Sequence, residues 1–129
     1  MSDSFNCFTM QLIKQKICDG RINDKGQIYD PNDIRQIGFL LGCEVVENMA
    51  KNSEKLKAFF HDLKRVAFCR FLPCEDTVYI DLCDKNRETI YASGFSRDIL
   101  EIVDFETLTN KAAITEGYMQ GIAFFSLQY

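Results

Sequence analysis

His61 is the only histidine in the 129-residue sequence, and it is the first candidate for acid–base or nucleophilic chemistry. Its neighbours Phe60, Asp62 and Lys64 place it at the surface of a predicted helix. Cys69 would lie two turns further along that helix, about 12 Å away, which is too far for a nucleophile and its base. The sequence therefore predicts an ordinary surface histidine and no Cys–His dyad.

A metal or haem site would need ligands at a recognised spacing. The candidate ligands are His61, Cys69, Cys74 and Cys83. No C-x-x-C pair and no second histidine accompany them, so their spacing fits no zinc motif. A haem held by His61 has no other support in the sequence. We expect no metal and no other cofactor.

The sequence offers little support for catalysis by paired carboxylates or for a phosphate-binding loop. Glu75 and Asp76 are adjacent acids that fit a solvated surface. The pair Gly38 and Gly42 lacks the Lys-Ser/Thr of a phosphate-binding loop and lies inside a predicted helix. Because no nucleophile, base and orienting group can be combined, we predict that the protein is not an enzyme.

Composition indicates one intracellular, cytoplasmic domain covering residues 1–129. Apolar residues make up 47% of the chain, enough for a core without disulfides. The formal net charge is -4, and no basic block is present to bind nucleic acid. The N-terminal residues have no signal-peptide pattern, and no apolar run reaches the ~20 residues of a membrane span. The six cysteines are therefore expected to be reduced and mostly buried.

Apolar periodicity predicts four helices and a β-hairpin. The hairpin strands are expected over residues 77–83 and 89–91, ending at Ser93-Gly94, and residues 99–103 fit either a strand or a helical turn. Helix starts are indicated by Ser4, by Asp30-Pro31 and by Asn52-Ser53. The helices are expected over residues 5–19, 31–49, 53 to about 72, and 106–125. This order predicts an α+β domain: a layer of about four helices with a small antiparallel hairpin or sheet.

Four of the seven glycines form two pairs spaced four residues apart. These are Gly38 with Gly42 in the second predicted helix, and Gly117 with Gly121 in the last. A glycine inside a helix costs about 1 kcal/mol relative to alanine, so two such pairs require a packing reason. We expect these two helices to pack closely in the middle of the fold.

Three segments resemble the small subunits of the transport protein particle (TRAPP), a vesicle-tethering complex. Residues 63–71 look like the third helix of that family, and residues 115–123 resemble its central helix with a Gly-x-x-x-Gly pair. The resemblance covers roughly residues 4–129. Its most extensive match, in the second helix, consists of Ile34, Ile37, Gly38, Phe39, Leu41, Gly42, Val46 and Glu47.

The resemblance implies a non-catalytic subunit that forms heterodimers with other TRAPP-type small subunits. Such assemblies act on early secretory membranes between the endoplasmic reticulum and the cis-Golgi, and support nucleotide exchange on a Rab-type GTPase. The implied dimer face lies on the first helix and comprises Phe5, Phe8, Leu12 and Ile13. These residues could instead cover the protein's own core, and both roles can hold together.

Two features depart from the family pattern. One branch of the family carries an acylated cysteine after the second helix, and residues 50–57 contain no cysteine. Most members continue past the central helix into a final strand, whereas this sequence ends at Tyr129.

Two further function classes remain open at this stage. A sensor domain for a small ligand would use His61, Cys69 and Tyr118 as its polar anchors. A viral or host adaptor would bind protein partners by an unrelated route.

Overall fold

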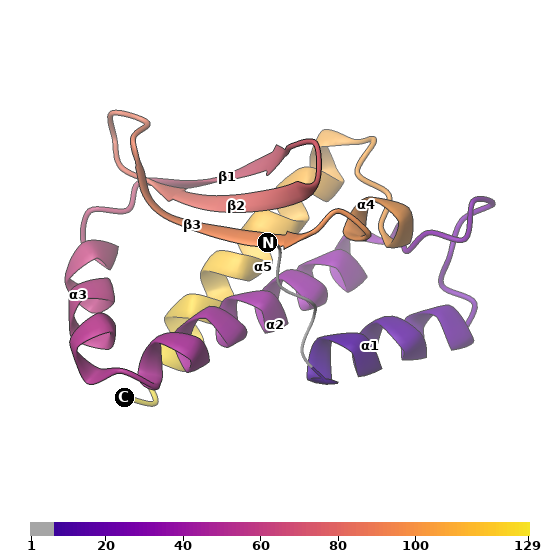
Figure 1. Cartoon of the computed structure of the whole chain (residues 1–129). Helices are drawn as coiled ribbons and strands as arrows, with labels where there is room; N and C mark the ends of the chain where they lie inside the picture. The colour runs from indigo at the N-terminus through magenta and orange to yellow at the C-terminus, as the bar shows by residue number, and fades with distance from the viewer. Residues whose placement is uncertain (1–6) are drawn as a thin grey trace.

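The computed structural model describes residues 7–129 as a helical layer with a sheet on one side (Figure 1). Its elements are α1 Cys7–Cys18, α2 Pro31–Ala50, α3 Ser53–Leu63, β1 Phe68–Pro73, β2 Thr77–Cys83, β3 Thr89–Ser96, α4 Ile99–Ile102 and α5 Leu108–Ser126. The predicted α+β class is confirmed. The sheet is antiparallel with strand order β1-β2-β3, so it has three strands instead of two.

Helices α2 and α5 cross side by side beneath the sheet, while α1 and α3 flank them (Figure 1). The core fills the space between the α2–α5 layer and the sheet. From α2 it receives Ile34, Ile37 and Leu41, which are fully buried, and from β2 it receives Val78, Ile80 and Leu82.

Helix α2 begins where the sequence indicates. The Asp30 side chain accepts a hydrogen bond from the Asn32 amide at 2.8 Å, and Pro31 occupies the first turn. An acceptor at this position satisfies an amide that has no partner within the helix.

The four paired glycines lie where α2 and α5 meet. A Cβ atom on Gly38 or Gly42 would overlap the carbonyl oxygen of Ile114 or Tyr118 on α5. In the reverse direction, a Cβ on Gly121 would overlap the carbonyl oxygen of Phe39. The two backbones therefore approach more closely than any side chain at these positions would allow.

The predicted third helix is too long. Helix α3 ends at Leu63, and Phe68–Pro73 forms edge strand β1, paired antiparallel with β2. Cys69 and Phe71 both pack against the core, as expected because alternate side chains of a strand lie on the same face of the sheet. Pairing with β2, the next strand along the chain, overrides the helical spacing suggested by Leu63 and Val66.

The returning strand is longer than predicted. It continues through Ser93 and Gly94 to Ser96. Gly94 pairs with Tyr79, and a Cβ on Gly94 would lie 3.2 Å from the Tyr79 ring. The glycine thus makes room for a ring on the neighbouring strand and does not end β3.

The ambiguous segment 99–103 contains both kinds of structure. α4 is a single turn over Ile99–Ile102. Val103 then forms a parallel bridge with Ile28, which ties the loop after α1 to the chain before α5.

Candidate partner interface

Helix α1 runs antiparallel to α2 and is attached at both ends. Thr9 donates a hydrogen bond to Glu44 at 3.2 Å near one end. Near the other end, Lys16 forms an ion pair of 3.3 Å with the buried carboxylate of Asp33. Arg21, just after α1, forms a second ion pair with Asp33 at 2.6 Å.

The expected dimer residues of α1 differ in their surroundings. Ile13 is 1% exposed and belongs to the protein's own core. Phe8 is 68% exposed, and Leu12, one helical turn further along the same side of α1, is half-buried. Phe5 lies outside the described residues. Of the expected dimer residues in α1, Phe8 is therefore the exposed one, while Leu12 packs against the core and leaves part of its side chain at the surface.

The apolar surface continues from α1 across α2 to α5. Leu12, Phe39, Leu40 and Gln36 line a shallow groove of about 270 Å³. Phe39 also packs on Phe124 of α5, with ring centroids 5.5 Å apart. We call this surface the helical apolar face; it consists of Phe8, Leu12, Phe39, Leu40 and Phe124.

Polar residues border the helical apolar face. Beside Phe39 a second hollow of about 360 Å³ is lined by Asn32, Arg35, Gln36 and Gln120. Arg35 forms an ion pair of 3.2 Å with Glu116 of α5. An apolar centre with a polar rim is the usual composition of a protein–protein interface.

Cys43 lies on α2, and its thiol contacts the Gly121 carbonyl oxygen of α5 at 3.8 Å. Burial, reinforced by the nearby Glu47 carboxylate, raises the pKa of Cys43. The protonated thiol therefore acts as a small apolar group at neutral pH.

The three candidates for chemistry differ in how deeply they are buried; they are His61, Cys69 and Tyr118. His61 is exposed on α3. Cys69 lies on β1, although the sequence predicted that the two residues would share one helix. Burial raises the pKa of Cys69 to about 12. Tyr118 is fully buried and its hydroxyl lies 2.5 Å from Ser93 Oγ. The Cys69 thiol packs against the core and the Tyr118 phenol lies inside it, so neither belongs to an open site.

Within residues 7–129, no cluster of three or more His, Cys, Asp or Glu side chains could hold a metal ion. The expectation of buried cysteines holds for Cys83, while Cys7, Cys18 and Cys74 are exposed. No helix in the described part of the chain is long and apolar enough to cross a membrane.

No family model, curated protein or solved structure matches this chain.

Sequence reasoning did not single out Leu40 or Phe124, and it used Phe39 only as part of a motif. The sequence signal that could have identified these residues is their position outside the buried apolar stripe of their helix. Phe39 and Leu40 fall between Ile37 and Leu41, which the helical period assigns to the core. Phe124 likewise lies beside the buried Ile122.

Proposed function

We propose that this protein is a non-catalytic subunit of a vesicle-tethering assembly that acts by binding other proteins. Its partners are TRAPP-type small subunits, and through them it supports nucleotide exchange on a Rab-type GTPase. It works in the cytoplasm, peripherally at membranes between the endoplasmic reticulum and the cis-Golgi. The observation that carries the proposal is the helical apolar face.

The helical apolar face fits a partner better than it fits water. Phe8 and Phe124 are 68% and 54% exposed, and they flank the groove at Leu12 and Phe39. Large apolar side chains that gather on one surface mark interaction sites more often than isolated ones do. Aromatic anchors of this kind supply much of the binding energy in protein interfaces.

The resemblance to TRAPP small subunits supplies the identity of the partner class. Its matches in α2 and α5 contain the glycine pairs at the helix crossing. The match at residues 63–71 carries less weight, because most of that segment is loop and strand.

The experiment is co-expression with candidate TRAPP small subunits, followed by measurement of molar mass. We expect a one-to-one heterodimer. The double substitution Phe8→Glu, Phe124→Glu should abolish it, because each carboxylate would lose water on entering the interface. The matched control is Leu108→Glu, a change of the same type at a side chain 82% exposed at the other end of α5.

A monomer that ignores every such partner would remove the tethering proposal. A heterodimer that survives Phe8→Glu, Phe124→Glu but is lost with Leu108→Glu would move the interface away from the helical apolar face.

The second candidate function is binding of a small ligand. It is favoured by an open pocket of about 550 Å³ between α3 and β3. None of His61, Cys69 and Tyr118, the residues considered for a sensor site, lines this pocket. An adaptor of unrelated origin would use the helical apolar face with a different partner, and the co-expression experiment separates it from the tethering role.

A further inference from the structure

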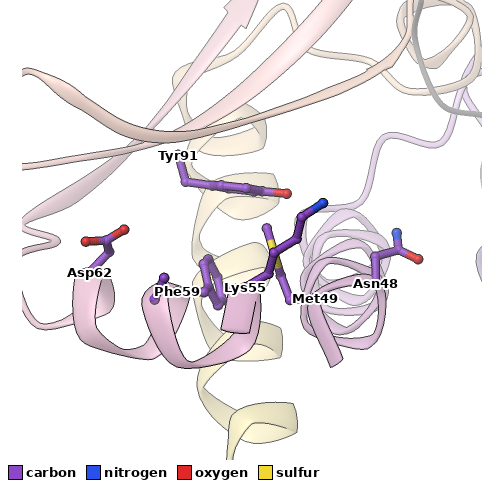
Figure 2. Close-up of a pocket in the computed structure, with 7 residues that line it drawn as sticks. Asn48, Met49, Lys55, Phe59, Asp62 and Tyr91 are labelled. Atoms are coloured by element: carbon purple, nitrogen blue, oxygen red, sulfur yellow. The ribbon is translucent and has the colours of Figure 1, made fainter. Parts of the chain in front are cut away.

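A pocket opens where the end of α2, one side of α3 and the start of β3 converge (Figure 2). Its volume is about 550 Å³, within the range of pockets that hold small organic ligands. Its lining residues are Asn48, Met49, Lys55, Ala58, Phe59, Asp62 and Tyr91.

The helical period of α3 builds one wall of this α3–β3 pocket. Lys55, Ala58, Phe59 and Asp62 follow the spacing i, i+3, i+4, i+7 and therefore share one side of the helix. The start of α3 is set by Asn52, whose side chain accepts hydrogen bonds from the amides of Glu54 and Lys55 at 3.0 and 3.2 Å.

The middle of the pocket is apolar. Phe59 is 4% exposed, and its ring meets the Tyr91 ring edge-on with centroids 5.3 Å apart. In Figure 2 the Tyr91 ring spans the pocket on the sheet side, opposite Phe59 and Met49. A flat or slender apolar group would lie beside this ring pair and contact aromatic carbon of Tyr91 and the Met49 thioether.

The two ends of the pocket differ in charge. In Figure 2 the Lys55 ammonium, the Asn48 amide and the Tyr91 hydroxyl lie toward one end, and Asp62 lies toward the other. Lys55 forms no ion pair within residues 7–129, whereas Asp62 pairs with Arg65 at 3.0 Å. Seven residues of helix separate Lys55 from Asp62 by about 10 Å, too far for a direct pair.

We propose that the α3–β3 pocket binds an elongated amphipathic aromatic acid. Its carboxylate is held by Lys55 with Asn48, and its aromatic body lies against Tyr91 and Met49, beside the Phe59–Tyr91 ring contact. A hydrogen-bond donor at its far end is accepted by Asp62. This site is independent of the proposed tethering role, because it shares no residue with the helical apolar face.

The charge balance favours an anion over an organic cation. A cation beside Phe59 and Tyr91 would have Asp62 as its counter-ion, but Arg65 already pairs with that carboxylate. An anion at the opposite end meets the Lys55 ammonium, which forms no ion pair within the described residues, and the neutral Asn48 amide, which can donate. Hydrogen bonds to charged groups contribute more than those between neutral groups.

The first experiment titrates the protein with 4-phenylbutyrate and follows backbone amide shifts by NMR. We expect saturable shifts confined to the end of α2, α3 and the start of β3, with a Kd of about 1 mM for so small a ligand. The uncharged 4-phenylbutyramide should bind about tenfold more weakly, because it lacks the charge that Lys55 recognises.

Two variants of α3 test the anion end. Lys55→Glu should weaken 4-phenylbutyrate binding by about tenfold or more. Lys57→Glu makes the same charge change at another exposed position of α3 that does not line the pocket, and it should leave the Kd unchanged.

The donor end is tested with 4-(4-aminophenyl)butyrate, whose amine and carboxylate stand at opposite ends. It should bind about threefold more tightly than 4-phenylbutyrate, and Asp62→Ala should abolish that preference. Loss of the preference with unchanged 4-phenylbutyrate binding is a readout that general unfolding would not produce.

Equal losses in Lys55→Glu and Lys57→Glu would show non-specific attraction and overturn the proposal. Shifts centred on the helical apolar face, or no saturable shift at 10-fold the expected Kd, would overturn it too. The Phe8→Glu, Phe124→Glu variant should bind 4-phenylbutyrate normally, which keeps this test separate from that of the tethering role.

Discussion

At the residue scale, the most restrictive positions are the glycines between α2 and α5. Each removes a Cβ atom that would overlap a carbonyl oxygen of the facing helix. A carbonyl of the helix backbone cannot rotate away as a flexible side chain can. The usual preference of helices for alanine over glycine should therefore be reversed here.

We predict that Gly121→Ala lowers the free energy of unfolding by about 2 kcal/mol, because it overpacks the contact with Phe39. At exposed Ala112, the opposite change Ala112→Gly should also destabilise, by about 1 kcal/mol, through helix propensity alone. Urea denaturation of both variants measures the two effects. A stabilising Gly121→Ala would contradict the close helix contact.

Ionisation of the Cys69 side chain makes the stability of the protein depend on pH. Burial raises its pKa from 9.0 in the unfolded reference to about 12. The unfolded chain therefore loses this proton at a lower pH than the folded protein does. The contribution of Cys69 is fully present below pH 9 and is lost as the pH rises toward 12.

We predict that the wild type loses about 1–2 kcal/mol more stability than Cys69→Ala when the pH is raised from 8 to 10.5. Denaturation curves at the two pH values measure this difference. Because burial also raises the pKa of Tyr118, both proteins should lose some stability in this range. Identical losses in the two proteins would show that Cys69 ionises as freely when folded as when unfolded.

The buried hydroxyl pair of Ser93 and Tyr118 connects β3 with α5. Tyr118→Phe should destabilise by about 1 kcal/mol, since it leaves the buried Ser93 hydroxyl without this partner. Adding Ser93→Ala to Tyr118→Phe should cost little more, because the remaining polar group is then removed. A double-mutant cycle measures this coupling, and simple additivity of the two changes would argue against it.

At the element scale, one buried carboxylate attaches the C-terminal end of α1. Asp33 is 3% exposed and pairs with Lys16 of α1 and with Arg21 just after it. Its side chain thus connects the start of α2 with the end of α1 and the loop that follows it.

We predict that Asp33→Asn lowers the stability by about 2 kcal/mol, because two cations lose a partly buried counter-charge. Amide hydrogen exchange should show α1 opening before the α2–α5 pair does. Asp62→Asn, which affects an exposed pair with Arg65, should change stability by less than about 0.5 kcal/mol. Equal acceleration of exchange across all helices would show that α1 does not open separately.

At the scale of the whole molecule, two surfaces are available on different elements. The helical apolar face spans α1, α2 and α5, while the α3–β3 pocket lies at the C-terminal end of α2. Because they share no residue, binding at one surface can be removed without removing the other.

We predict that the isolated protein self-associates with rising concentration and that Phe8→Glu, Phe124→Glu suppresses this association. Its free energy of unfolding should change by less than about 1 kcal/mol, because both side chains are mostly exposed. Sedimentation velocity and urea denaturation provide the two measurements. Persistent association in this variant would place the adhesive surface elsewhere.

The sequence alone was sufficient for the features that depend on neighbours along the chain. The N-cap at Asp30, the start of α3 after Asn52 and the alternation within β2 all follow from local hydrogen bonding and side-chain period. The two glycine pairs indicated a close helix contact, because their penalty within an isolated helix required a compensating neighbour.

Only the tertiary structure decided the features that depend on contacts between elements. Phe68–Pro73 forms a strand because it pairs with β2, the next element along the chain, and helical spacing does not report that pairing. Phe39 and Phe124 form one surface because the glycines bring α2 and α5 together. The α3–β3 pocket likewise combines Lys55, Asn48 and Tyr91 from three elements. Periodicity reports which side of an element is apolar, but the packing of the whole chain determines what that side meets.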